Sequence, residues 1–259
     1  MKPTLSVILP AYKQEKTIVS NIKRLKKSLD LLKIPYEIVC VADGRVDKTQ
    51  RILRKAKIAN VLSLGYEQNR GKGHAVRYGM TQAKGEIVGF VDSGDLDYTV
   101  LPLLLEHMNW YDADIMIASK KHPASKVYYP WQRRIISSVY QLMVRMLFGL
   151  NVRDTQVGMK FFRREVIEKV LPRILVKEFA FDIEMLAVAH HLGFIKIYEA
   201  PVKLKLDFSN NSSVVSKGFS KMVIGMIVDT ISVFYRLKIL HYYDDANKKN
   251  WQPNMYLEW

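Results

Sequence analysis

Residues Asn69–Asp95 read NRGKGHAVRYGMTQAKGEIVGFVDSGD, and this stretch indicates the fold class of the chain. A glycine-rich turn begins a helical pattern over Gly71–Ala83, and an apolar, β-rich run follows over Glu86–Val91. That run ends directly in acidic residues. A helix that leads into a buried strand, with a polar turn behind it, is the repeating unit of a parallel sheet.

The same alternation extends to both sides of this stretch. Further strands are predicted at Leu5–Pro10, Tyr36–Ala42, Val61–Leu64 and Ala113–Ser119, and further helices at Lys16–Leu32, Lys48–Lys57 and Val100–Asn109. The series predicts an α/β fold with a largely parallel sheet that helices cover on both faces. Ligands bind such sheets beyond the carboxyl ends of the strands, so the residues that follow each strand are candidates for a site.

Composition limits the class of protein. The chain has 259 residues, 49% of them hydrophobic, which is enough for one large domain with a C-terminal appendage. The single cysteine, Cys40, lies in an apolar run, so we expect neither a disulfide framework nor a thiol metal cluster, as in a reducing, cytoplasmic setting. Met1–Thr4 lead directly into a strand without the features of a signal peptide, so we expect this domain not to be exported.

The charge indicates the kind of partner. Forty Lys and Arg against 25 Asp and Glu give a formal net charge of +15, which favours nucleic acid, an acidic membrane or phosphorylated ligands. The sequence contains no zinc-finger or ribonucleoprotein motif, so we expect no nucleic-acid partner.

Two apolar segments that contain basic residues indicate a membrane surface. They are Trp131–Gly149 and Phe219–Tyr243, and we expect both to be interfacial helices. The apolar stretch Met222–Tyr235 is short and interrupted by Asp229, which argues against a transmembrane span. The prediction is a catalytic domain over residues 1–215 and a membrane-associating segment over 216–259, held peripherally at the cytoplasmic face of a membrane.

Three carboxylates within six residues follow the strand at Glu86–Val91. Asp92, Asp95 and Asp97 repel one another, so a cation is expected among them. Mg²⁺ or Mn²⁺, shared with the phosphates of a nucleotide, would provide it. An acidic turn that caps the next helix is an equally good interpretation.

Two further turns at strand ends carry groups suited to a nucleotide. The carboxylate of Asp43 can accept hydrogen bonds from a nucleobase edge, although an ordinary strand-to-helix turn explains it as well. Gly71-Lys72-Gly73 lets the backbone and an ammonium group approach a phosphate, but it does not match the P-loop pattern.

Taken in order, these segments resemble glycosyltransferase family 2, and specifically its branch that acts on polyprenyl phosphates. The resemblance extends from about Leu5 to Lys205. It rests on LSVILPAY, VADGRVDKT and the stretch quoted first, followed by VRDTQVGMKFFRREV, FAFDIEMLAVAHHLG and YEAPVKL. The last three are the most specific segments.

The resemblance implies a fold of the GT-A type and a set of donor-site residues. The implied nucleotide-sugar site consists of Pro10, Ala11, Tyr12, Glu15, Asp43, Lys72, Asp92, Asp154 and Gln156. Asp92 would begin the acidic metal motif, in which the family carries Asp-x-Asp-x-Gln. Gly94 replaces the second Asp here, and an insertion of one residue would make Asp92, Asp95 and Asp97 the metal ligands.

The resemblance also implies an acceptor site and a reaction centre. Arg133 and Arg134, with Lys120 in place of a family arginine, would hold the acceptor phosphate. Asp182 and Glu184 would lie near the reacting atoms. Lipid headgroups are an alternative partner for the arginines, and helix capping is an alternative role for Asp182.

The resulting hypothesis is a metal-dependent, inverting transferase that moves one hexose from a GDP-mannose or UDP-glucose type of donor to a polyprenyl phosphate. A family 2 enzyme with a polysaccharide hydroxyl acceptor and a non-catalytic membrane scaffold remain as alternatives. A homo-oligomer is left open.

Overall fold

The computed structural model describes residues 3–93, 97–127, 131–178, 180–204 and 217–252. Within these ranges the side chains of residues 126–127, 131–135, 203–204 and 217–222 are not described. Asp95, one of the predicted metal ligands, and the predicted domain boundary at residue 215 lie outside the described residues.

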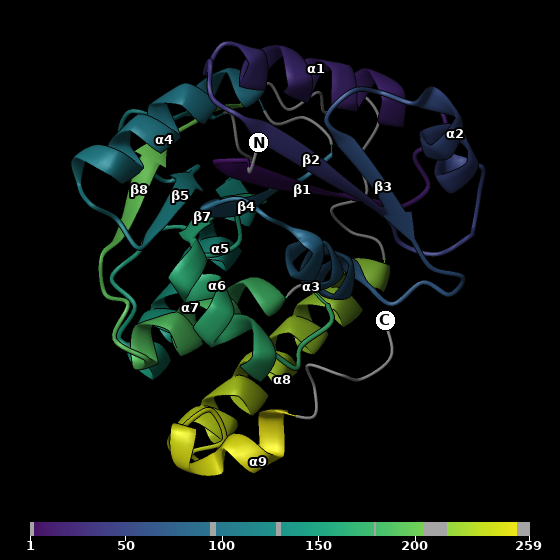
Figure 1. Ribbon diagram of the computed structural model, residues 1–259. Helices are drawn as coiled ribbons and strands as arrows, with labels where there is room; N and C mark the ends of the chain where they lie inside the picture. The colour runs from purple at the N-terminus through teal and green to yellow at the C-terminus, as the bar shows by residue number, and fades with distance from the viewer. Residues whose placement is uncertain (1–2, 94–96, 128–130, 179, 205–216, 253–259) are drawn as a thin grey trace.

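A seven-stranded sheet forms the centre of the molecule (Figure 1), with the order β3-β2-β1-β4-β7-β5-β8. The strands are β1 (Leu5–Ala11), β2 (Tyr36–Ala42), β3 (Val61–Gly65), β4 (Ile87–Val91), β5 (Ile115–Ser119), β7 (Met159–Arg163) and β8 (Ile197–Pro201). All neighbouring pairs are parallel except those of β7, which is antiparallel to both β4 and β5. The prediction of a largely parallel α/β sheet is therefore confirmed.

Helices cover both faces of this sheet, as predicted. In Figure 1, α1 (Ile18–Asp30), α2 (Thr49–Ala56) and α4 (Leu101–Trp110) lie above it, and α3 (Lys72–Gln82), α6 (Arg164–Val170) and α7 (Phe181–His191) lie below it. The 3-10 turns η1 (Tyr98–Val100) and η2 (Leu171–Arg173) adjoin α4 and α6. Because both faces of β1 are covered, all its residues are buried, which explains its continuous apolar run.

The strands β7 and β8 are not among those predicted from the sequence. β7 reads MKFFR and contains Lys160, whose side chain is fully buried in the middle of the sheet. A charged residue at the centre of a short run weakens the hydrophobic pattern from which strands are predicted. β7 nevertheless completes the sheet by joining β4 to β5.

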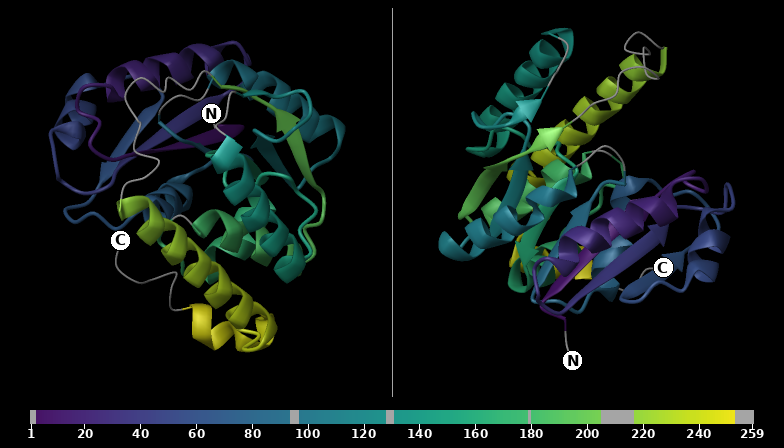
Figure 2. Two further views of the ribbon diagram at one scale, coloured as in Figure 1. Left: turned by 180° about the vertical axis from the view of Figure 1, so that it is seen from behind. Right: turned by 90° about the horizontal axis from the view of Figure 1, so that it is seen from above.

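Two long helices project from the sheet domain. They are α5 (Trp131–Phe148), which matches the prediction, and α8 (Lys217–Lys238), and Figure 2 shows them extending in the same general direction. Tyr140 Oη and Thr230 Oγ1 form a buried hydrogen bond of 2.7 Å between them. A short parallel pair, β6 (Lys126–Val127) and β9 (Lys203–Leu204), lies outside the main sheet.

The C-terminal helical segment ends earlier than predicted. We expected it to continue to Tyr243, but α8 ends at Lys238 and the chain continues into η4 (Asp245–Asn247) and α9 (Lys248–Trp251). Tyr243 and Trp251 are buried. Arg173 holds this part of the chain, because its Nε donates to the Tyr243 carbonyl at 2.8 Å and its guanidinium stacks on Trp251. Tyr243 and Trp251 thus pack on the sheet domain.

Candidate active site

The carboxyl ends of β1, β2 and β4 meet at an open pocket of about 400 Å³. These strands are neighbours in the sheet, so the residues after them converge. The lining residues are Pro10, Ala11, Tyr12, Gln14, Asp43, Asn69, Gly71, Lys72, Asp92, Ser93 and Glu178. Six of the residues predicted for the donor site, Pro10, Ala11, Tyr12, Asp43, Lys72 and Asp92, therefore lie around one cavity.

Asp43 is buried at the end of β2 and organises one wall of the pocket. Its carboxylate accepts hydrogen bonds from the Tyr66 hydroxyl at 2.9 Å, from Asn69 Nδ2 at 2.8 Å and from the Arg70 backbone N–H at 2.8 Å. A carboxylate offers about four acceptor positions, so one remains for a ligand. Asp43 can thus both fix the wall and accept a hydrogen bond from a nucleobase.

Lys72 and Asp92 form an ion pair inside the pocket. Lys72 Nζ lies 2.9 Å from Asp92 Oδ1 and 3.7 Å from Asp182 Oδ2. Burial by itself lowers the pKa of Lys72, but Asp92 and Asp182 outweigh this effect and raise the pKa above its ordinary value. Lys72 is therefore charged throughout the neutral range, and its ammonium group can bind a diphosphate.

A second lysine supports this pair from inside the sheet. Lys160 Nζ lies 2.5 Å from Asp182 Oδ1 and donates to the Val157 carbonyl at 2.5 Å. Burial lowers the pKa of Lys160, and Asp182 opposes that shift. Asp182 is held between two ammonium groups, so it acts as their counter-charge. The alternative role predicted for it, helix capping, is not observed, because α7 has no side-chain cap.

Gly158 leaves room for the Asp92 carboxylate. A Cβ atom at this position would lie 1.8 Å from Asp92 Oδ2, far closer than real contacts allow. The Asp92 backbone N–H donates to the Gly158 carbonyl at 2.7 Å, so the two residues are also fixed relative to each other. The Asp92 carboxylate can thus occupy this place in the pocket only because residue 158 is a glycine.

Replacing Gly158 by alanine should therefore displace the Asp92 carboxylate. We expect Gly158→Ala to lower the turnover of donor sugar about a hundredfold, because a misplacement of about 1 Å at a reacting centre has that effect. Gly225→Ala is the matched control, since a Cβ at Gly225 would meet nothing within 4 Å. Steady-state rates of both variants test this prediction, and a fully active Gly158→Ala would contradict the importance of the Asp92 position.

The acidic run after β4 is only partly a candidate metal site. Asp92 lines the pocket with a half-exposed side chain. Asp97 Oδ1 instead accepts from the Thr99 backbone N–H at 3.0 Å and from the Thr99 hydroxyl at 2.7 Å, so it caps η1. Within the described ranges, no three His, Cys, Asp or Glu side chains are grouped as metal ligands. For Asp97 the structure thus shows the capping role that was the alternative interpretation.

Four lining residues were not among the site residues predicted from the sequence, namely Gln14, Asn69, Ser93 and Glu178. Gln14 Nε2 donates to the Ser93 carbonyl at 3.2 Å and ties the loop after β1 to the acidic loop. Glu178 lies before α7, and its pKa is raised by burial and by the nearby Asp43. Gln14 follows the first predicted strand, whereas Glu178 follows no predicted strand, so no pattern in the sequence indicated its place in the site. The predicted Glu15 does not line the pocket, because Oε2 of its carboxylate accepts from the Lys48 backbone N–H at 3.1 Å.

The predicted loop residues Asp154 and Gln156 lie outside the pocket lining. Asp154 is buried, and its Oδ2 accepts from the Lys120 backbone N–H at 3.0 Å. The Asp154 backbone N–H donates to Glu199 Oε1 at 2.9 Å, and Gln156 N–H donates to Asp154 Oδ1 at 3.3 Å. Asp154 therefore joins the residue after β5 and the middle of β8 to the loop before β7. Lys120 and Gln156 remain proposals for acceptor and donor binding.

Arg133 and Arg134 lie in the first turn of α5, but their side chains are outside the described part of the chain. Their role at the acceptor phosphate therefore remains a proposal.

Glu184 is not placed where we expected it. We predicted a position near the reaction centre, but its side chain is fully buried and does not line the pocket. Burial raises its pKa, while Arg236 and the Tyr243 hydroxyl oppose that shift. The reason is helical spacing: Asp182 and Glu184 lie two positions apart on α7, so they face different directions.

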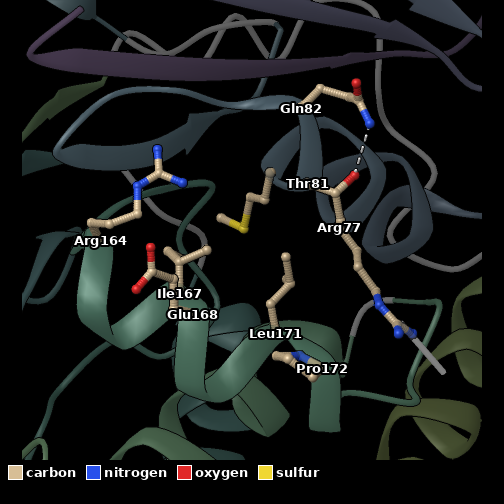
Figure 3. A pocket seen from close by; sticks show the side chains of 9 residues that line it. Arg77, Thr81, Gln82, Arg164, Ile167, Glu168, Leu171 and Pro172 are labelled. Carbon is tan, nitrogen blue, oxygen red and sulfur yellow. Dashed lines mark hydrogen bonds between the residues drawn. The ribbon is translucent and has the colours of Figure 1, made fainter. Parts of the chain in front are cut away.

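A second crevice, of about 420 Å³, lies between α3 and α6 (Figure 3). Met80, Ile167, Leu171 and Pro172 give it an apolar floor, and Arg77 and Arg164 lie at its edges. Arg164 Nε donates to the Gly85 carbonyl at 2.8 Å, before the amino end of β4. Because donors bind at the carboxyl ends of the strands, this crevice is not assigned to the donor.

Comparisons with known proteins agree with the geometry. The sequence model of Glycosyl transferase family 2 matches residues 6–171. A dolichyl-phosphate beta-glucosyltransferase from Drosophila melanogaster is 32% identical over 208 residues, which are 73% of this chain and 63% of that protein. One from Dictyostelium discoideum is 31% identical over 214 residues, or 76% of this chain and 65% of that protein. The chain thus spans slightly less than two thirds of the length of these relatives.

A solved structure confirms the fold. Glucosyl-3-phosphoglycerate synthase from Mycobacterium tuberculosis, in complex with Mn²⁺, UDP-glucose and phosphoglyceric acid, superposes with a TM-score of 0.66 at 19% identity. The match covers 90% of this chain and 80% of that one. At this identity the likeness concerns the fold alone, and it agrees with the GT-A type predicted from the sequence.

Proposed function

Since this chain belongs to Glycosyl transferase family 2, we propose that it transfers one glucose from UDP-glucose to a polyprenyl phosphate, with inversion at the anomeric carbon. The observation that carries the proposal is the convergence of Asp43, Lys72 and Asp92 on one pocket at the strand ends. The sequence left GDP-mannose and UDP-glucose open, and the names of the relatives favour glucose.

The acceptor chemistry explains why no strong general base is needed. A phosphate monoester is already anionic near neutral pH, so it can attack the anomeric carbon directly. Catalysis then consists of positioning the reactants and stabilising charge. Lys72 lies where it can neutralise the departing diphosphate, and Arg133, Arg134 and Lys120 are proposed to orient the incoming phosphate. A single displacement inverts the anomeric centre.

Asp92 can supply one carboxylate ligand of a divalent metal site. Mg²⁺ is commonly bound by one or two carboxylates together with substrate phosphates, so a full protein cage is not required. Asp92 is half-exposed in the pocket and next to Lys72, where a donor diphosphate would bind. A bound Mg²⁺ or Mn²⁺ supplies charge neutralisation at the leaving group. Lys72 provides a second positive charge at the same place.

We also propose that α5 and α8 place the enzyme on a membrane surface, where the lipid acceptor is found. α8 presents an exposed row, the α8 stripe, made of Ile224, Val228, Ile231 and Tyr235. α5 presents a similar row of Ile136, Val139, Leu142 and Met146. Within the described ranges, no helix is long and apolar enough to cross a bilayer. The net charge of +15 adds attraction to an anionic surface.

Charges in the α8 stripe should weaken membrane binding. Each apolar side chain that enters the bilayer contributes about 1.5–3 kcal/mol, so Val228→Asp/Ile231→Asp should reduce partitioning to anionic vesicles more than tenfold. Both positions are exposed, so the fold should be retained. Liposome flotation measures the effect. Binding of the unchanged chain should weaken in high salt without vanishing, because salt screens only the basic side chains.

The matched control for this experiment is Leu31→Asp/Ile195→Asp, which places the same charges at exposed apolar positions away from α5 and α8. It should float like the unchanged chain. If both double variants float equally well, the stripe does not bind lipid. A concentration-dependent dimer that only the stripe variant loses would identify a second copy of the chain as the partner instead.

Metal-dependent hydrolysis of UDP-glucose without lipid separates an enzyme from a non-catalytic scaffold. We expect slow hydrolysis, because water can replace the acceptor in an open pocket. A chain that binds UDP but never cleaves UDP-glucose, with or without lipid, would support the scaffold.

A further inference from the structure

Glu184 is a buried carboxylate that receives hydrogen bonds from two separate parts of the chain. Its Oε2 accepts from the backbone N–H groups of Leu175 at 2.9 Å and Val176 at 2.7 Å. Its Oε1 accepts from the Tyr243 hydroxyl at 2.6 Å and lies 3.4 Å from Arg236 Nη2. All four partners are donors, so the ionised carboxylate is the form that these contacts satisfy.

On one side, Glu184 holds the segment 174–178, which reaches the donor pocket. The Lys177 carbonyl accepts from the His74 backbone N–H at 3.2 Å, and the Glu178 side chain lines the pocket. A Cβ on Gly71 would lie 2.6 Å from Glu178 Oε1 and 2.7 Å from the Lys177 carbonyl oxygen. The segment therefore lies directly against the glycine turn that carries Lys72.

On the other side, Glu184 holds the helix that carries the α8 stripe. Arg236 lies on α8, and its Nε donates to the Tyr243 hydroxyl at 3.0 Å. Tyr243 follows α8 and is fully buried. The two residues and Glu184 form one cluster, in which Glu184 and Tyr243 are buried and Arg236 is partly buried, so a shift of α8 would change the contacts of the carboxylate. A single side chain thus joins the proposed membrane helix to the wall of the donor pocket.

We propose that Glu184 is a positioning residue that couples α8 to the donor pocket. When α8 binds a bilayer, this coupling increases the affinity of the donor pocket for the nucleotide. The inference rests on the proposed function, from which the donor and the membrane are taken. A bilayer that fixes α8 also fixes Arg236 and Tyr243, and through Glu184 it fixes the 174–178 segment against Gly71. Such coupling is reciprocal, so the bound nucleotide must strengthen membrane binding by the same factor.

A purely structural role for Glu184 makes a different prediction. A buried carboxylate with four donors contributes to stability whatever α8 touches. Its loss would then lower the melting temperature, while the ratio of nucleotide affinities with and without membrane would not change. That ratio is therefore the informative measurement.

The experiment measures UDP binding by the full chain in the presence of Mn²⁺, with and without vesicles of phosphatidylcholine and phosphatidylglycerol. In the unchanged chain we expect vesicles to tighten UDP binding about fivefold or more. Tyr243→Phe removes the shorter of the two contacts on the α8 side, while the 3.4 Å contact of Arg236 and the two bonds to the 174–178 segment remain, so the vesicle effect should become clearly smaller. Glu184→Gln should lose the vesicle effect, and its melting temperature is measured beside that of the unchanged chain.

Tyr140→Phe is the matched control. It removes the buried hydroxyl of a tyrosine on α5, which pairs with Thr230 on α8 and not with Glu184, so the variant should keep the full vesicle effect. An unchanged chain that floats with vesicles but binds UDP equally well without them would overturn the inference and leave the proposed function standing. A Tyr243→Phe variant with the full vesicle effect would overturn it too. Absence of any UDP binding would instead remove the proposed donor, and the inference with it.

Discussion

Asp92→Ala should lower glucosyl transfer about a thousandfold while the fold remains intact, because it removes a preorganised charge at the reacting centre. The backbone at this position is held without the side chain, since the Asp92 N–H donates to the Gly158 carbonyl at 2.7 Å and the Tyr98 hydroxyl donates to the Asp92 carbonyl at 3.0 Å. Lys72 keeps Asp182 as a partner at 3.7 Å. Single-turnover rates and thermal melting measure the two parts of this prediction.

Asp97→Ala is the matched control. Asp97 is either the cap of η1 or a metal ligand, and the two interpretations predict different losses of activity. As the cap of η1, Asp97 contributes about 1 kcal/mol of stability and little to turnover. As a metal ligand, it would be almost as important as Asp92. Equal loss of activity in both variants would support the alignment with one inserted residue and contradict the capping role as its main function.

Removal of the metal tests whether a divalent ion at Asp92 is needed for transfer. We expect transfer to stop in excess chelator and to return with Mg²⁺ or Mn²⁺, because the departing diphosphate then lacks its principal counter-charge. Full turnover in chelator would show that Lys72 alone supplies the counter-charge, and the proposed metal dependence would be wrong.

The double variant Arg133→Ala/Arg134→Ala should slow transfer to polyprenyl phosphate by about 30- to 4,000-fold. Loss of a charge-assisted contact to the acceptor phosphate costs about 2–5 kcal/mol. The affinity for UDP should not change, because these two residues are proposed to contact the acceptor phosphate and not the nucleotide. Transfer rates and UDP titrations measure the two quantities separately.

The control here is Arg51→Ala/Arg54→Ala, which removes the same charge from the exposed side of α2. It should affect membrane binding only slightly and acceptor turnover not at all. If the α5 variant loses donor affinity as much as transfer rate, its arginines serve the nucleotide instead.

Strands and their polar ends could be predicted because their causes are local. β1, β2 and β4 are covered on both faces, which produces continuous apolar runs, and their carboxyl ends carry Pro10, Asp43 and Asp92. Since these strands are adjacent, the residues after them had to converge. This part of the site follows from pattern and fold class together.

Other parts depend on contacts that a sequence pattern does not contain. Lys160 interrupts the apolar run of β7, and only its pairing with Asp182 explains a charge there. Glu178 reaches the pocket because Glu184 and α3 hold its segment in place. Glu184 itself resembled a catalytic carboxylate in the sequence, and its partners Arg236 and Tyr243 lie more than fifty residues away along the chain.

Formation of a labelled lipid shows whether the chain transfers glucose to a polyprenyl phosphate. The full chain is incubated with Mg²⁺, polyprenyl phosphate in detergent and radiolabelled UDP-glucose or GDP-mannose, and the lipid is then extracted. We predict label in the lipid fraction from UDP-glucose, dependent on the polyprenyl phosphate and absent with Asp92→Ala. Label that appears only from GDP-mannose would contradict the proposed donor. Label that stays in the aqueous phase with every donor, or that enters a polymer, would contradict the proposed acceptor.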